Sequence, residues 1–297
     1  MTTTRARAST FGAVSIVNAI AGGRGATASV RLTTDAEVEL DDSKGEWDFR
    51  VNGKKAESSL SLETVRRAIR LAGKDPDAYS GKVSTTTGVP IGVGLKTSSA
   101  ASTAIAIAVA GALGRRAFDP KKVLDCSVEA SLASGASITG ALDDAAGCLM
   151  GGLNMTDNLA RKVVSSRLFE KRLKVVVGVP RARSRRDSIE PGSIRRFAHL
   201  TDLFFEMALK GDYWRAMVLN GITYSSILKY DPFPALLAVE HGALGAGLSG
   251  TGPAVAAVFE PSKKAEIEAL KGRWASDGCE VIETETNNEH GRLLEVG

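Results

Sequence analysis

The sequence predicts an α+β protein built from two domains. Its 297 residues suffice for one large or two medium domains, and its 43% hydrophobic and 24% charged residues are ordinary for a globular chain. The first half places a glycine-rich turn directly before a long alanine-rich helix. The second half alternates strand, helices, strand, helix and strand, which is typical of an α+β sandwich. We therefore expect domains at 1–155 and 156–297.

The first domain is expected to open with a β-hairpin. Residues 11–21 form an apolar run that ends in glycines, and residues 28–40 alternate like a half-buried strand. The ten residues before this hairpin, MTTTRARAST, lack an apolar segment and predict a short terminal tail.

The rest of the first domain predicts two short strands and three helices. Strands are expected at 46–51 and 81–87, because the latter is rich in β-branched and hydroxyl residues. Apolar residues recur at helical spacing over 61–72, with Gly73 suited to the end of that helix. Further helices are expected from Ser99 to Gly114 and over 121–134, and residues 151–158 are expected to form a loop.

The second domain begins with a clear buried strand at 173–179, LKVVVGV. The sequence then predicts helices at 195–209, 213–219, 234–243 and 262–276, and a last strand at 279–285. Between the first strand and these helices lie four close arginines, Arg181, Arg183, Arg185 and Arg186. They could pair with a carboxylate or phosphate, although a solvated loop is the commoner meaning of such a run.

The stretch at 88–101, GVPIGVGLKTSSAA, predicts an anion site. Its glycines allow the backbone to approach a ligand closely, and the helix behind it points its positive end at the loop. Lys96 adds a full charge, and the Thr97, Ser98 and Ser99 hydroxyls can reach a phosphate or a metal. The P-loop pattern fails because Leu95 stands where glycine is required, and the dinucleotide pattern fails at Thr97.

A second informative stretch, SGASITGALDDAAGCLMGG, places Asp143 and Asp144 side by side among small and apolar residues. Buried carboxylates need partners. The alternative is a helix N-terminus, where acidic side chains are stabilised in any case. A third stretch, GLSGTGPAV, joins a helical segment to a strand, which is the reverse of the order that dinucleotide binding requires.

These three stretches, in this order, resemble the motifs of the GHMP small-molecule kinases. Pro90 to Ala101 is similar to the family loop P-x-x-x-G-L-G-S-S-A-A, with Lys96-Thr97 in place of one glycine, and this GLKTSSAA variant resembles the archaeal shikimate kinases. The resemblance implies a two-domain fold, with a ribosomal protein S5 domain 2-like N-terminal domain and a ferredoxin-like C-terminal domain. It also implies ATP and Mg²⁺ as cofactors.

The resemblance assigns roles residue by residue. Asp144 matches the catalytic aspartate, with Asp143 one residue away, and Ser99 and Glu129 would bind magnesium. The ATP loop would comprise Pro90, Ile91, Gly92, Val93, Gly94, Leu95, Lys96, Thr97, Ser98, Ser99 and Ala100. The acceptor, shikimate, would meet Asn18, Arg183, Arg185, Arg186, Gly250 and Thr251, although Asn18 could equally satisfy a backbone group.

The implied reaction is phosphoryl transfer from ATP to a hydroxyl of shikimate. Homoserine or mevalonate as acceptor, or a nucleotide-binding regulator without catalysis, are the alternatives. A net charge of +4 fits an anionic ligand without requiring nucleic acid. The scattered cysteines and histidines predict no zinc site. We expect a cytoplasmic protein that spans no membrane, and the sequence indicates no oligomeric state.

Overall fold

A long antiparallel hairpin is the central element of the fold. The computed structural model describes residues 3–115, 119–181 and 191–297. In it, β1 (Thr3–Val17) pairs with β2 (Arg24–Asp41) from Thr3 opposite Asp41 to Val17 opposite Ala26. The predicted hairpin is therefore confirmed, but the predicted N-terminal tail is wrong. Ala6 and Ala8 are buried while Arg5 and Arg7 pair with Glu37, so the charges lie on the outer face of a real strand.

The hairpin belongs to an eight-stranded sheet with the order β12-β1-β2-β5-β3-β4, to which β6 and β7 attach through β2. The other members are β3 (Trp47–Val51), β4 (Lys54–Lys55), β5 (Ser80–Thr87), β6 (Leu153–Asp157), β7 (Lys162–Arg167) and β12 (Arg292–Val296). The loop expected at 151–158 is wrong, because β6 pairs with the first residues of β2. The strand β12, which the sequence analysis missed, returns to pair with β1.

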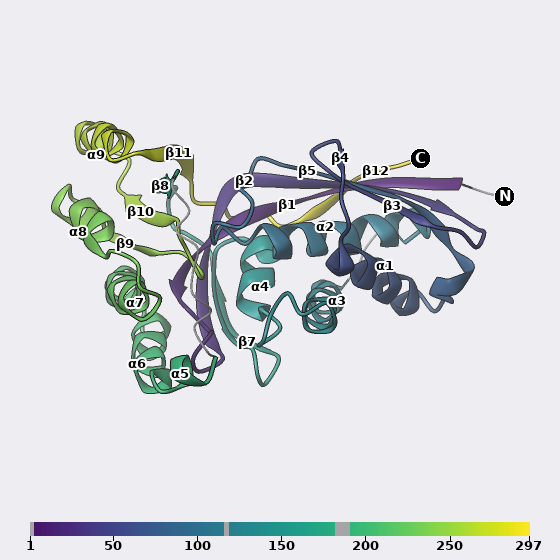
Figure 1. The fold of residues 1–297 in the computed structure, drawn as a ribbon, viewed down its shortest axis with the longest axis horizontal. Coiled ribbons are helices and arrows are strands. Elements are labelled where there is room, and N and C mark those ends of the chain that lie inside the picture. Colours follow the sequence, from purple (N-terminus) through teal and green to yellow (C-terminus); the bar gives the residue numbers. More distant parts are fainter. Residues whose placement is uncertain (1–2, 116–118, 182–190) are drawn as a thin grey trace.

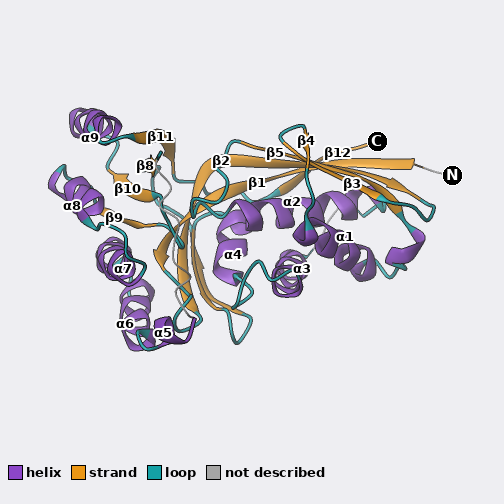
Figure 2. Cartoon of the chain, viewed as in Figure 1, coloured by secondary structure: helices purple, strands orange, loops and turns teal. Residues whose placement is uncertain are grey.

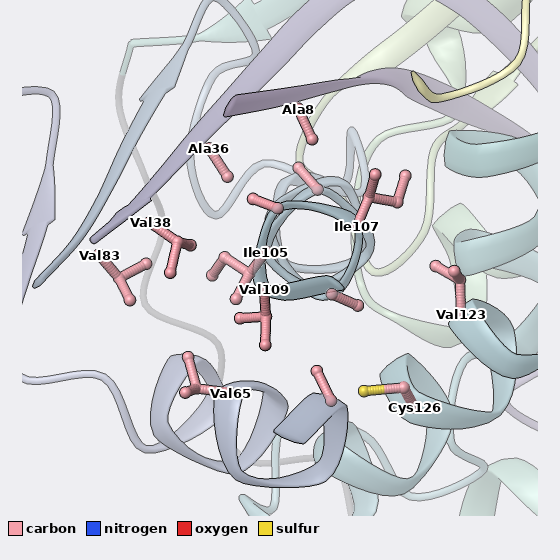
Figure 3. Packing of buried hydrophobic residues seen from close by; sticks show 14 of the residues in the cluster. Ala8, Ala36, Val38, Val65, Val83, Ile105, Ile107, Val109, Val123 and Cys126 are labelled. Carbon is pink, nitrogen blue, oxygen red and sulfur yellow. The ribbon is translucent and has the colours of Figure 1, made fainter. Parts of the chain in front are cut away.

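Helices cover one face of this sheet, as Figure 1 shows in its right-hand part. They are α1 (Ser59–Leu71), α2 (Thr97–Ala112), α3 (Pro120–Ala133) and α4 (Leu142–Met150), with a short 3₁₀ turn, η1 (Pro76–Ala78), after α1. Figure 3 shows the core between these layers, where Val38 and Val83 of the sheet face Ile105 and Val109 of α2. Alanine and glycine let α2 lie close to β1, and Gly111 packs against Ala6.

The second sheet is antiparallel, with the order β11-β8-β10-β9. It contains β8 (Lys174–Pro180), β9 (Gly245–Leu248), β10 (Val255–Phe259) and β11 (Cys279–Glu285). The helices of this half are α5 (Pro191–Arg195), α6 (Ala198–Leu209), α7 (Tyr213–Ile227), α8 (Phe233–Glu240) and α9 (Lys264–Ser276), shown at the left of Figure 2. Strand, helices, two strands, helix and strand is the β-α-β-β-α-β order of a ferredoxin-like domain, as predicted.

The two sheets share a second core. Val14 and Ile16, near the turn of the hairpin, pack in one cluster with Val175 and Val177 of β8 and Met217 of α7. The β1–β2 hairpin thus contributes to both cores, so its turn is held between the two halves. The division at residue 155 stays a prediction. Within the described ranges, no helix has the length and apolar character needed to cross a membrane.

Candidate active site

A pocket of about 490 Å³ opens where four segments distant in sequence meet. The end of β1, the glycine-rich loop with the start of α2, the segment from α3 into α4, and the loop after β9 each supply part of its wall. The lining residues are Asn18, Ala19, Ile20, Gly92, Gly94, Lys96, Thr97, Ser98, Ser99, Ser131, Gly135, Ala136, Ser137, Ile138, Thr139, Ala141, Asp143, Asp144, Gly250 and Thr251. The three motifs of the sequence therefore meet around one cavity.

The glycine-rich loop depends on backbone conformations that favour glycine. Gly92 and Gly94 have φ of 73° and 94°, and a Cβ on Gly94 would collide with the carbonyl oxygen of Ser249. The Ser249 hydroxyl donates to the Gly94 carbonyl at 2.8 Å, which ties the loop to the second half of the chain. Val93 and Leu95 are fully buried, so they anchor the loop from behind, and their side chains do not line the pocket.

The helix α2 begins without a side-chain cap from the described residues. Its N-cap is Lys96, with φ of 64°, and the Thr97 hydroxyl instead donates back to the Pro90 carbonyl at 2.9 Å. The first backbone N–H groups of a helix have no intrahelical partner. The pocket wall formed by Thr97, Ser98 and Ser99 therefore presents these donors, and the positive end of the helix dipole, to a ligand.

Lys96 and Asp144 form an ion pair in the pocket wall. Lys96 Nζ lies 2.8 Å from Asp144 Oδ1, and the Lys96 side chain is 5% exposed against 22% for Asp144. Burial alone would lower the pKa of Lys96, but the Asp144 and Asp143 carboxylates outweigh it and raise the pKa above its usual value. Lys96 is therefore a charged group at this position.

Asp143 is the more deeply buried of the two acids, at 4% exposed. Burial, followed by the neighbouring Asp144 charge, raises the pKa of Asp143 to about 7, against the opposing effects of Lys96 and Asn158. Its Oδ1 accepts a hydrogen bond from Asn158 Nδ2 at 2.8 Å, and its Oδ2 packs against Gly25. Asp143 thus changes its charge near neutral pH, within reach of both charges of the Lys96–Asp144 pair.

Asn18 connects the end of β1 to the loop after β9. Its Nδ2 donates to the Gly250 carbonyl at 2.6 Å, and its backbone N–H donates to Asn220 Oδ1 at 2.9 Å. Gly250 N in turn donates to the Ser15 hydroxyl at 2.9 Å. Asn18, Gly250 and Thr251 all line the pocket, and the Asn18 amide also satisfies a backbone carbonyl. Their contact with the acceptor stays a prediction.

The other predicted site residues that the structure describes do not line the pocket. The Glu129 carboxylate pairs with Arg161 at 3.2 Å and Arg67 at 3.7 Å and does not line the pocket, so the geometry gives its metal-binding prediction no support. Within residues 3–115, 119–181 and 191–297, no group of three or more His, Cys, Asp and Glu side chains is arranged to hold a metal. Pro90, Ile91 and Ala100 do not line the pocket either. Arg183, Arg185 and Arg186 fall outside the described residues.

Sequence reasoning missed the residues that hold the site together. Asn158, Ser249, Ser15 and Asn220 are buried and hydrogen-bond to pocket residues or to the pocket loop. A single polar residue within an apolar run is the signal that drew attention to Asn18. The same signal marks Asn220 and Ser15, but it does not reveal their partners, which lie more than 200 residues away in sequence.

Comparison with known proteins defines the class. The model of the GHMP kinases N-terminal domain matches residues 62–152, and that of the GHMP kinases C-terminal domain matches residues 235–276. A homoserine kinase structure from Cytophaga hutchinsonii shares the fold, with a TM-score of 0.74, 17% identity, and coverage of 98% of this chain and 97% of that one. A mevalonate kinase structure from Methanococcus jannaschii has a TM-score of 0.67 at 13% identity, covering 99% and 98%.

Curated relatives narrow the class further. A shikimate kinase of Methanothrix thermoacetophila is 36% identical over 97% of this chain and 96% of its own length. A shikimate kinase of Methanothermobacter thermautotrophicus is 36% identical over 96% of both chains, and one of Pyrococcus furiosus is 34% identical over 91% and 95%. The chain belongs to the GHMP kinase family and, within it, to the group of these archaeal shikimate kinases.

Proposed function

We propose that the protein transfers the γ-phosphoryl group of ATP to a hydroxyl of shikimate, giving 3-phosphoshikimate for aromatic amino acid biosynthesis. The observation that carries this proposal is the meeting of the 88–99 loop, the Asp143–Asp144 pair and the 250–251 loop around one pocket. The full-length similarity to proteins named shikimate kinase supports the choice of acceptor. The three free cysteines fit a reducing, cytoplasmic setting.

The pocket residues fit a nucleotide triphosphate. The pocket volume of about 490 Å³ falls within the range typical of small-molecule sites. The uncapped start of α2 offers backbone donors and a positive dipole end, and Lys96 adds a charge, so the phosphates would lie against residues 92–99. Phosphoryl transfer asks a protein mainly for positioning and charge stabilisation, and these groups can supply both.

The same wall offers oxygen ligands suited to magnesium. Mg²⁺ in kinases commonly keeps several waters and takes few protein ligands beside the phosphates. The Ser99 hydroxyl, with Ser98 next to it, is the protein oxygen we propose for this role, because both residues line the pocket beside the helix start. When bound, the ion would neutralise charge on the phosphates.

Asp144 is the residue we propose to orient the acceptor hydroxyl. Its side chain is partly exposed to the pocket, whereas Asp143 is buried. Asp144 Oδ1 lies 2.8 Å from Lys96 Nζ, and the Asp144 carboxylate can accept a hydrogen bond from the hydroxyl and take up its proton as the new O–P bond forms. Asn18, Gly250 and Thr251 would contact the ring of the acceptor from the opposite side.

The proposal is tested by incubating the purified protein with ATP, Mg²⁺ and shikimate, and following a shikimate phosphate by mass spectrometry. Homoserine and mevalonate are assayed in parallel under the same conditions. We expect phosphorylation of shikimate and background turnover with the other two. A higher kcat/KM for either of them, with a folded protein that binds ATP, would reject shikimate as the acceptor while leaving the kinase class intact.

A further inference from the structure

Asn158 stands directly after β6 and is 2% exposed. Both ends of its amide are used. Its Oδ1 accepts from the Asp143 backbone N–H at 3.1 Å and from the Thr156 hydroxyl at 2.7 Å. Its Nδ2 donates to Asp143 Oδ1 at 2.8 Å and to the Thr139 hydroxyl at 3.3 Å. One side chain therefore holds the main chain and the carboxylate of Asp143 at the same time.

The helix that carries Asp143 needs such a partner. The N-cap of α4 is Ala141, which has φ of 52° and makes no side-chain cap hydrogen bond. A helix start is normally stabilised by a side-chain oxygen that accepts a hydrogen bond from a backbone N–H of its first turn. Asn158 supplies that oxygen from outside the helix, 15 residues further along the chain. The backbone N–H of Asn158 donates to the Gly23 carbonyl at 2.8 Å, which fixes the amide to the hairpin turn.

We propose that Asn158 is a positioning residue of the active site, which caps α4 from outside and holds the Asp143 carboxylate, and so sets the direction in which Asp144 meets the acceptor hydroxyl. This inference rests on the proposed function. Asp144 is the next residue on the same first turn, so a rotation of that turn moves both carboxylates. Such a rotation would also move Asp144 away from Lys96 Nζ, which belongs to the glycine-rich loop.

The hydrogen bond from Asn158 to the Asp143 carboxylate matters because charged groups surround Asp143. Asp144 on its own helix repels the Asp143 carboxylate, and Lys96 from the glycine-rich loop attracts it. The Asn158 amide donates to the charged form, and a hydrogen bond to a charged group is stronger than one between neutral groups. Removing the donor leaves Asp143 buried against a like charge, so it should keep its proton to higher pH.

The test compares Asn158→Ala and Asn158→Asp with a matched control, Asn154→Ala. Asn154, on β6, is equally buried, but its amide donates to the Gly151 carbonyl and accepts from Ser166, away from the pocket. Asn158→Asp retains the acceptor for the α4 N–H and loses the donor, so it covers the case in which the alanine variant does not fold. The readouts are the pH profile of kcat and the Asp143 titration by carboxyl ¹³C NMR, assigned with Asp143→Asn.

We expect a loss of about 100-fold in kcat for both Asn158 variants, as for a misplaced catalytic group. The acidic limb of the kcat profile and the Asp143 titration should both move up by about one pH unit. Asn154→Ala should lower Tm without moving either curve. If the Asn158 variants lose stability but keep the wild-type pH profile and Asp143 titration, the positioning role is refuted. The NMR shift is measured without substrate, so it stands or falls separately from the shikimate assignment.

Discussion

At the residue scale, the site depends on three neighbouring charges with different exposure. Lys96 and Asp144 pair at 2.8 Å in the pocket wall, and Asp143 lies behind them, buried and held by Asn158. Unequal burial gives the adjacent acids different properties, because the buried carboxyl of Asp143 resists ionisation, whereas the Asp144 side chain is partly exposed and lies next to a cation. The sequence pattern placed both acids in the site, and the structure distinguishes them.

The Asp144→Asn variant tests the role of the exposed acid. We expect kcat to fall by about 100-fold or more, because the amide cannot accept the hydroxyl proton, while the fold and ATP affinity change little. Stopped-flow or coupled assays give kcat, and calorimetry gives the ATP affinity. Near-normal turnover in a folded Asp144→Asn protein would show that transfer proceeds without this group.

Asp143 should make stability depend on pH. Its pKa in the folded protein is about 7, above the usual value of 3.8, so the folded state binds a proton that the unfolded state has released between these pH values. The free energy of unfolding contributed by this group therefore falls as pH rises from about 4 to about 7. Asp143→Asn removes the buried charge, so we expect its Tm to exceed that of the wild type at pH 8 by more than at pH 5.

Differential scanning calorimetry at the two pH values checks this expectation. Asp157→Asn, at the end of β6, is the control for the loss of an aspartate charge, since Asp157 is only partly buried and pairs at 3.8 Å with Arg24. An Asp143→Asn protein whose Tm difference from wild type is the same at pH 5 and pH 8 would contradict the raised pKa.

At the scale of single elements, the glycine-rich loop is held at Gly94 by a backbone contact that leaves no room for a side chain there. Gly94 abuts the Ser249 carbonyl, and the Ser249 hydroxyl returns a hydrogen bond to Gly94. Gly92 has a similar positive φ but open space where a Cβ would lie. A side chain at Gly92 would therefore meet only the cost of the left-handed backbone conformation, whereas one at Gly94 would meet that cost and the clash with Ser249.

Replacing each of these glycines by alanine tests the contact. Gly92→Ala should lower the free energy of unfolding by about 1–2 kcal/mol, the cost of a left-handed conformation for a residue with a Cβ. Gly94→Ala should lower it further, because the loop or the Ser249 segment must also shift. Urea denaturation measures both values. Equal losses in the two variants would mean that the close approach of Gly94 to Ser249 does not constrain the loop.

At the scale of the whole molecule, the last strand returns to the first. In β12, Leu293 pairs opposite Ala8 and packs against Gly111 of α2, while its neighbour Leu294 is 45% exposed. The end of the chain therefore closes one edge of β1 and covers the helix whose N-terminus forms the pocket. Stability of the first core and the position of α2 are linked through this strand.

The variants Leu293→Ala and Leu294→Ala test whether β12 stabilises the first core through its contact with α2. We expect the first to lower the free energy of unfolding by about 2 kcal/mol, since Leu293 is partly buried and its truncation leaves a gap beside α2. The second should change it by less than about 0.5 kcal/mol, as is usual for exposed positions. Chemical denaturation gives both values, and similar losses would show that β12 packs only loosely on α2.

Much of the fold and the site could be predicted because their signals are local. A few residues are enough to indicate the alanine-rich helix α2, the buried strand β8 and the alternating strand β2. The glycine-rich loop with its lysine likewise indicates an anion site from its own residue types. Strand β12 and the β6 strand could not be recognised in the same way. Both are short, and what makes them strands is pairing with β1 and β2, whose positions the chain decides only once folded.

The sequence by itself determined the two-domain α+β class, the three motifs and the chemical groups of the pocket, because glycine conformation, helix dipoles and carboxylate charge are properties of short segments. The tertiary structure alone decided which acid is buried, that Glu129 turns to Arg67 and Arg161, and that Asn158 and Ser249 hold the site. These outcomes depend on burial and on hydrogen bonds between distant segments. Such interactions exist only when the hairpin turn, α4 and the second sheet have come together.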